Sequence, residues 1–262
     1  MTNGKRLSIY TSLNVKASIE ERIAAIAEAG FDAVCLDFEK ELEPTETSWE
    51  NQLALCEKYA LPVEAVHLTG ENMNAVWSEG EAGEHVIGRL IDETARMASL
   101  GLTCPGVCHV TWGHDVPHAP DETGLARFLR AADAAEKVGV TIALENSVFP
   151  EYLQFILERV DSKRIGFCYD SGHENAFSPS YDYLSRFGSR LAAVHLHDNH
   201  GTMDEHAIPF TGTVDWSKKV GQLKQTELWR KAVSLESTVP PSMTLSEGLR
   251  KSWEAADRLA GL

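Results

Sequence analysis

The sequence has no apolar stretch that approaches the roughly 18 to 20 residues of a membrane-spanning helix. Its first residues, MTNGKRLSIYTSL, include a basic pair but lack the apolar core and the small-residue cleavage site of a signal peptide. We therefore expect a cytoplasmic protein without a membrane-spanning segment.

Cysteine is scarce, and its spacing is uninformative for metal or disulfide chemistry. The five cysteines are Cys35, Cys56, Cys104, Cys108 and Cys168, an odd number with no C-x-x-C pair. This pattern argues against both a disulfide framework and a zinc knuckle. Cys35, Cys108 and Cys168 fall in apolar stretches, where we expect them to pack as small hydrophobic residues.

Lysine and arginine are also few relative to the acidic residues. The chain has 24 lysines and arginines against 39 aspartates and glutamates, which gives a formal net charge of −15. This balance disfavours non-specific binding to nucleic acid or to an anionic membrane. No G-x-S-x-G, Walker A or H-E-x-x-H motif occurs, so a nucleophilic serine or a zincin site has no support.

Short apolar segments alternate with amphipathic helical segments along all 262 residues. The first helix illustrates the signals, because Ser18 and Glu21 form a capping box and Gly30 ends the apolar stripe. We predict strands at 7–13, 33–38, 63–68, 106–112, 140–144, 165–169, 191–194 and 232–235. The helices that follow them are predicted at 18–30, 47–59, 85–100, 122–138, from 150, at 181–187, 216–223 and 245–259.

These repeats predict a single-domain α/β protein, a (β/α)8 TIM barrel spanning residues 1–262. The predicted strands are continuous apolar runs, as expected for parallel strands covered on both faces. Eight strand–helix units without a linker favour a closed barrel. A doubly wound open sheet would need a glycine-rich turn after the first strand, where the chain has the residues TSLN at 11–14.

Ionisable residues cluster where the predicted strands end, which is where barrel enzymes place their active sites. Such residues are costly to bury unless they are paired or bind metal. They are His67, His109, Glu145, Asp170, His173, His195 and Glu236, with Asp204 and His206 in the loop after the seventh strand. Strand alternation places His195 and His197 on the same side of that strand.

Each candidate also has an inert interpretation. His67 and His109 are compatible with hydrogen-bonded core histidines, and Asp204 and His206 with a solvated pair. An inert role for Glu145, Asp170 and Glu236 together is much harder to accept, because each ends an apolar strand. Trp77 and Trp112 fit either the wall of a sugar pocket or a cover over the barrel rim.

The segments LENS, YDSGH, HLHDN, DEH, GTVDW and LES together resemble the xylose isomerase-like barrel superfamily. This superfamily includes sugar isomerases and epimerases, hydroxypyruvate isomerases and the endonuclease IV family. The resemblance covers essentially the whole chain, and it is specific for the superfamily rather than for one reaction.

Similarity to the ketose epimerases implies metal ligation by Glu145, Asp170, His195 and Glu236. Glu145 and Glu236 would also be the catalytic acid/base pair, and His173, His67 and Trp112 the substrate contacts. The resemblance implies a divalent ion, Mn²⁺, Mg²⁺ or Co²⁺, with Zn²⁺ also compatible. Such an ion makes a proton next to a carbonyl more acidic, and the two glutamates would move that proton through an enediolate.

Similarity to endonuclease IV implies a different site, with three zinc ions. The additional metal ligands would be His67, His109, His173, Asp204 and His206. However, the chain has NSVFP at 146–150 instead of an AGQG-like loop, and it lacks the lysine and arginine of the family's seventh loop. We therefore expect a metal-dependent sugar isomerase or epimerase. The alternatives are an endonuclease IV-like zinc phosphodiesterase and a catalytically silent sugar-binding barrel.

The distribution of basic residues predicts the charge of the substrate. Lys16 and Lys40 lie in the first two loops after the strands, whereas the loops after strands three to eight contain no lysine or arginine. Acidic residues fill the segments 39–46 and 71–84. Because phosphate recognition usually recruits arginine or lysine, we expect a neutral, unphosphorylated carbohydrate as substrate and no nucleic-acid partner. The sequence leaves homo-oligomer formation open.

Overall fold

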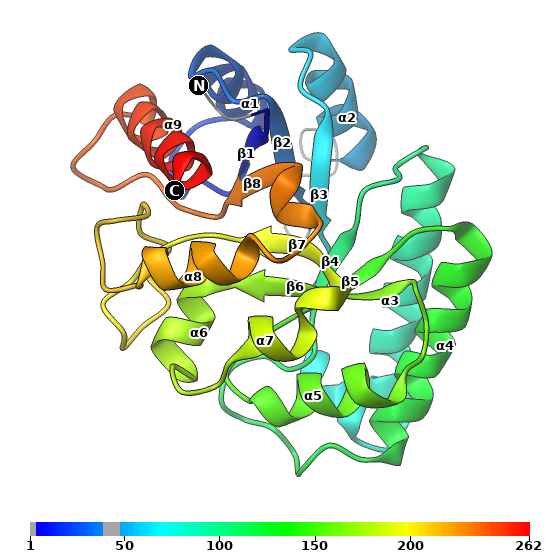
Figure 1. Cartoon of the computed structure of the whole chain (residues 1–262). Helices are drawn as coiled ribbons and strands as arrows, with labels where there is room; N and C mark the ends of the chain where they lie inside the picture. Colours follow the sequence, from blue (N-terminus) through cyan, green and yellow to red (C-terminus); the bar gives the residue numbers. More distant parts are fainter. Residues whose placement is uncertain (1–3, 39–47) are drawn as a thin grey trace.

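The computed structural model describes residues 4–38 and 48–262, and the strands in these ranges form one parallel eight-stranded sheet in the order β7-β6-β5-β4-β3-β2-β1-β8. The predicted (β/α)8 barrel is therefore confirmed, with helices arranged around the strands (Figure 1). The strands are β1 Arg6–Tyr10, β2 Ala33–Asp37, β3 Val63–His67, β4 Gly106–His109, β5 Ile142–Glu145, β6 Ile165–Asp170, β7 Leu191–His195 and β8 Ala232–Leu235.

The barrel closes where the chain leaves β7 beside β8. The amide of Leu196 donates to Ser234 O at 3.1 Å, and the amide of Glu236 donates to Leu196 O at 3.2 Å. Leu196 and Leu235 form a parallel bridge. The closing contacts therefore involve the residues next to His195 and Glu236, which fixes the ends of these two strands side by side.

Capped amphipathic helices cover the outside of the barrel (Figure 1). The predicted capping box of Ser18 and Glu21 is present at the start of α1, and Ile19, Ile23 and Ile26 are its buried stripe. The helices are α1 Ile19–Glu28, α2 Trp49–Lys58, α3 Glu81–Ser99, α4 Glu122–Val138, α5 Pro150–Arg159, α6 Ser171–Phe177, α7 Tyr183–Phe187, α8 Trp216–Leu223 and α9 Leu245–Gly261. Three 3-10 turns, η1 Met73–Trp77, η2 Gly188–Arg190 and η3 Leu228–Arg230, complete the described elements.

Several predicted boundaries were wrong. The strands predicted at 7–13 and 106–112 end at Tyr10 and His109, because the chain turns into loops at the barrel mouth. The third major helix begins at Glu81 rather than His85. Helix α6 was not predicted, and it begins directly after β6 because the Asp170 side chain accepts a hydrogen bond from the His173 amide.

Trp77 belongs to the core rather than to a sugar pocket. Its side chain is fully buried, and its Nε1 donates to Val110 O at 2.8 Å. The ring packs against Phe128 and Tyr152. Trp77 therefore fastens the loop after β3 to the barrel and is not available for substrate.

The barrel interior is lined by small side chains below the site. Val107, Ala143, Cys168 and Ala193 form one interior cluster, while the large apolar side chains fill the layer between strands and helices. Cys35, Cys108 and Cys168 are buried and free, as predicted. Within the described residues, no helix combines the length and apolar character required to cross a membrane.

Candidate functional site

Six successive strands, β3 to β8, place candidate metal ligands at one mouth of the barrel. His67, His109, Glu145, Asp170 and His195 are the last residues of β3 to β7, and Glu236 directly follows β8. The strand register places His109 beside Glu145 and Asp170 beside His195. Because the carboxyl ends of parallel barrel strands share one mouth, this pattern brings the candidates together.

The four ligands implied by the epimerase resemblance form a central group. Side-chain ligand atoms of Glu145, Asp170, His195 and Glu236 all lie within 4.8 Å of one another. His195 Nδ1 lies 2.9 Å from Glu145 Oε1, 2.9 Å from Glu236 Oε2 and 3.8 Å from Asp170 Oδ2. One imidazole and three carboxylates are a donor set suited to a hard or borderline divalent ion.

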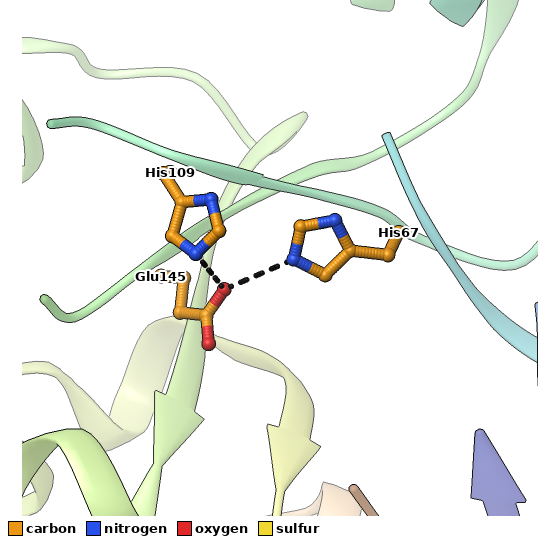
Figure 2. Close-up of side chains that lie close together, drawn as sticks. All are labelled: His67, His109 and Glu145. Atoms are coloured by element: carbon orange, nitrogen blue, oxygen red, sulfur yellow. Dashed lines mark ion pairs between the residues drawn. The ribbon is translucent and has the colours of Figure 1, made fainter. Parts of the chain in front are cut away.

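Two further imidazoles point at the other oxygen of Glu145 (Figure 2). His67 Nε2 lies 3.4 Å and His109 Nε2 lies 3.2 Å from Glu145 Oε2. His67 donates its Nδ1–H to Leu68 O at 2.9 Å, so in the neutral ring the Nε2 lone pair faces the carboxylate. Figure 2 shows both rings turned edge-on towards this single oxygen, which makes the three side chains a second donor group.

A third donor group surrounds Asp204 in the loop after β7. His206 Nε2 lies 2.9 Å and His173 Nε2 lies 3.3 Å from Asp204 Oδ2. Both rings donate their Nδ1–H to backbone carbonyls, His206 to Glu236 O at 2.7 Å and His173 to Asn146 O at 2.9 Å. A backbone partner at Nδ1 is the usual way in which proteins orient a histidine whose Nε2 binds metal.

The pKa shifts show that the buried carboxylates at this mouth are stabilised by positive charge on neighbouring groups. Burial raises the pKa of Glu145, but the imidazoles of His195 and His109 outweigh burial and hold that pKa well below its usual range. Burial lowers the pKa of His67, yet the neighbouring Glu145 carboxylate raises it to about 9. Without a cation, protons on His67 and His206 accompany the buried carboxylates, whereas burial lowers the pKa of His109 to about 3.

A metal fits these residues better than protons do. Glu145 Oε2 is buried and accepts no well-formed hydrogen bond, although two imidazole nitrogens lie within 3.4 Å of it. Nδ1 of the buried His109 also makes no hydrogen bond. The two imidazole nitrogens and this carboxylate oxygen present lone pairs to one another. A divalent ion bound between them would coordinate all three.

The remaining predicted substrate contacts lie around these donor groups. Trp112 is 51% exposed, and its ring meets the His109 ring edge-on with a centroid distance of 4.7 Å. Asn74 holds the Trp112 backbone, because its side chain bonds both the amide and the carbonyl of that residue. Trp112 thus forms part of the rim next to the second donor group.

Three polar residues of the site were not among the predicted site residues. Tyr10 ends β1 and lies 2.8 Å from His195 Nε2 through its hydroxyl. His197 is fully buried, and its Nε2 lies 3.1 Å from Asp170 Oδ2. Asp198 is fully buried and accepts hydrogen bonds from Trp216 Nε1 and from the amides of Phe210 and Val214.

Asp198 explains how the seventh loop presents its donors. Its backbone pairs with Ala207 through hydrogen bonds of 2.7 and 2.9 Å, and its side chain ties the end of the same loop to α8. These contacts fold the intervening segment over the mouth with Asp204 and His206 turned inwards. The HLHDN segment thus supplies a ligand candidate and the anchor of the loop.

Part of the charge argument lies outside the described residues. Lys40 and the acidic segment 39–46 fall within the range 39–47, which the structure does not describe. Lys16 is exposed. The described loops after β3 to β8 contain no lysine or arginine before the next predicted helix, as the sequence shows.

Known proteins share this architecture. A D-tagatose 3-epimerase-like protein has a crystal structure that superposes with a TM-score of 0.75 at 20% identity, covering 97% of this chain and 96% of that chain. The IOLI protein, solved with a bound zinc atom, superposes with a TM-score of 0.80 at 17% identity over 98% of each chain. At these identities the likeness establishes the fold alone.

Sequence similarity gives the family. The curated protein y4fM of Sinorhizobium fredii, itself uncharacterized, is 29% identical over 215 residues, and the match spans 76% of this chain but only 65% of that relative. The family model described as "xylose isomerase-like TIM barrel" matches residues 23–257. The chain therefore belongs to the xylose isomerase-like TIM barrel family.

Proposed function

We propose that the protein is a divalent-metal-dependent isomerase or epimerase of a small sugar or related hydroxy-carbonyl compound. One observation carries the proposal. Glu145, Asp170, His195 and Glu236 come from four adjacent strands and present their ligand atoms within 4.8 Å of one another. The epimerase-like protein and the zinc-containing IOLI structure, which share the fold, support the same kind of chemistry.

A divalent ion held by these four residues would make a proton next to a substrate carbonyl more acidic. Glu145 and Glu236 then do the proton transfer. One carboxylate removes the proton to give an enediolate, and the other returns a proton at the neighbouring atom or on the opposite face. Glu145 is fully buried and Glu236 reaches the mouth with its side chain 12% exposed, so the two approach the site from different depths.

The proposed substrate contacts are side chains at the rim of the barrel mouth. His173, whose side chain is 11% exposed, contacts the central group through Nδ1, 3.4 Å from Glu145 Oε1. His67 and Trp112 border the adjacent side of the mouth. Since the loops after β3 to β8 carry no cationic side chain, we assign a neutral, unphosphorylated substrate to this site.

The test is turnover by metal-reconstituted protein. Protein stripped with chelator and reloaded with Mn²⁺, Co²⁺, Mg²⁺ or Zn²⁺ is assayed against a panel of free ketoses, aldoses and hydroxypyruvate. The proposal predicts product formation with at least one loaded form and none with the stripped protein. Equal turnover in stripped and reloaded protein would contradict metal dependence.

One observation favours a second function, an endonuclease IV-like zinc phosphodiesterase. Residues matching the endonuclease IV ligand set lie at one mouth, since His67 and His109 face Glu145 and both His173 and His206 face Asp204. Three ions bound there would supply positive charge for a phosphate, which lysines and arginines otherwise provide. Cleavage of a duplex with one abasic site by zinc-loaded protein, together with silence on the sugar panel, would make this the function.

A further inference from the structure

His197 is a fully buried imidazole outside the three donor groups above, and one of its ring nitrogens lies within 4.8 Å of ligand atoms of His206 and Glu236. Its Nε2 lies 3.1 Å from Asp170 Oδ2 and 3.6 Å from Asp204 Oδ1. Its ring stacks on the His206 ring, with a centroid distance of 4.3 Å and an interplanar angle of 6°. A single side chain therefore contacts the central group and the donor group of the seventh loop.

The orientation of Asp170 depends on this contact. Asp170 Oδ1 accepts the backbone amide of His173 at 2.6 Å, as the cap of α6. Oδ2 is the oxygen that faces His195 Nδ1, and it meets His197 Nε2 in a hydrogen bond. Carboxylates that bind metal are commonly oriented by such a hydrogen bond from a neighbouring side chain.

The fold provides a fitted space for the His197 ring. A Cβ atom at Gly172 would lie 1.9 Å from His197 Cε1, so α6 can pass the ring only with glycine at this position. The backbone of His197 is clamped as well, since Ser171 Oγ donates to His197 O at 2.8 Å and accepts the His197 amide at 3.1 Å. The imidazole is thus held from two directions at its place beside Asp170.

A cavity of about 600 Å³ lies between the seventh loop and α9, lined among others by Ile208, Phe210 and Arg258. The Arg258 side chain crosses it and lies over the Phe210 ring, 3.8 Å from the ring centroid. His206 also adopts a left-handed backbone conformation, with φ of 48°, which a residue other than glycine rarely adopts without surrounding contacts. The stacking of His206 on His197 is one of the contacts that hold this conformation.

We propose that His197 is a positioning residue that orients Asp170 through Nε2 and holds the Asp204–His206 loop through its ring, so that metal binding in the central group is coupled to order in that loop. The proposal rests on the proposed function, because it takes Asp170 as a metal ligand. It deepens that function by assigning a role to a side chain that lies between two donor groups.

Three substitutions separate the two contacts. His197→Gln keeps an amide nitrogen near the place of Nε2, His197→Phe keeps an aromatic ring on His206, and His197→Ala removes both. The readouts are the dissociation constant of the tightest-bound Mn²⁺ or Zn²⁺, by competition with a chelator, and hydrogen exchange of residues 203–211. His85→Gln is the matched control, since His85 is an exposed imidazole on α3, outside the monitored segment.

We expect His197→Phe to weaken metal binding by about 10- to 100-fold, the range for lost outer-shell partners, with loop exchange near that of wild type. His197→Gln should bind metal within about threefold of wild type but exchange faster in the loop. His197→Ala should lose both properties and His85→Gln neither. If His197→Ala does not fold, the Phe and Gln variants decide the matter, because both fill the space next to Gly172.

Metal binding by His197→Phe as tight as in wild type, or unchanged loop exchange in folded His197→Gln and His197→Ala, would overturn the inference and leave the proposed function standing. Wild-type protein that binds no divalent ion would overturn the proposed function, and with it the role of His197. The two failures are therefore distinguishable in one experiment.

Discussion

The Tyr10 hydroxyl at the end of β1 lies 2.8 Å from His195 Nε2 at the end of β7, and both side chains are fully buried or nearly so. Their rings meet edge-on with a centroid distance of 4.8 Å. The contact fixes the imidazole with Nδ1 towards the carboxylates of Glu145 and Glu236. With Nδ1 as the metal ligand, Nε2 carries the proton and donates to Tyr10.

Removing this hydroxyl should weaken metal binding without disrupting the fold. We expect Tyr10→Phe to lower the affinity of the tightest-bound ion by about tenfold, because an outer-shell partner of a ligand is lost. Titration of chelator-treated protein by calorimetry measures it. Tyr183→Phe is the control, since Tyr183 is equally buried but bonds Ser178 away from the site. Equal affinities of Tyr10→Phe and wild type would show that the hydroxyl does not orient His195.

The number of ions bound tests the donor groups beyond the central one. If these groups bind metal rather than substrate, two or three equivalents of divalent metal per chain should be found, because His67 and His109 share Glu145 and a separate pair of imidazoles faces Asp204. In that case His67→Ala should lose one equivalent and keep the central ion. Elemental analysis of protein purified without chelator gives the count. A single equivalent in wild type, unchanged in His67→Ala, would reduce the imidazoles around Glu145 to core or substrate-binding residues.

Substrate charge follows from the lack of cationic side chains in the loops after β3 to β8. For an active sugar and its phosphate ester, we expect a higher kcat/KM for the free sugar, because no arginine or lysine at the mouth would bind the phosphate. Steady-state kinetics on such a pair decides the matter. A higher kcat/KM for the ester would show that metal ions or helix N-termini take over phosphate recognition.

The metal-free protein should lose stability as the pH rises. Burial lowers the pKa of His67 and His206, but Glu145 raises that of His67 to about 9, and Asp204 and Glu236 raise that of His206 to about 10. Both values exceed the roughly 6.5 of an unfolded histidine. This stabilisation is therefore complete below about pH 6.5 and is lost as the pH rises through 9 to 10.

Thermal denaturation of chelator-treated protein between pH 6 and pH 10 checks this dependence. The Tm should fall over that range, and the fall should be smaller in His67→Gln. Added metal should flatten the curve, since a bound cation replaces the imidazole protons. A Tm that rises with pH in the stripped protein would contradict the assigned charge balance.

Much of the candidate site was predictable because, in a parallel barrel, residues at the ends of different strands lie close together. Glu145, Asp170 and Glu236 each end an apolar strand, and the shared mouth of a parallel barrel brings such residues together. The same rule placed His67 and His109 at this mouth, although the strands predicted to end at residues 13 and 112 end at Tyr10 and His109. The signal was an ionisable residue at the end of an apolar strand, and this signal does not require exact strand boundaries.

The missed residues lacked such a signal. Tyr10 looks like an ordinary core aromatic, and only the approach of β1 to His195 across the barrel reveals its hydroxyl contact. His197 was placed on the same side as His195, but the pairing of its ring with Asp170 and His206 depends on the short helix α6 and on Gly172. That helix is short and has no apolar stripe, and its one local signal, the Asp170 cap, was not interpreted as a helix start.

The most direct test of the central claim is deuterium incorporation during turnover. Metal-loaded protein is incubated in heavy water with the sugar that the panel identifies, and the product is examined by NMR. The account predicts deuterium at the carbon where the proton is moved, and a loss of turnover of about 10²- to 10⁴-fold in both Glu145→Gln and Glu236→Gln, because each removes a group that transfers the proton. Conversion without solvent deuterium, or turnover that survives both substitutions, would contradict proton transfer by these two glutamates.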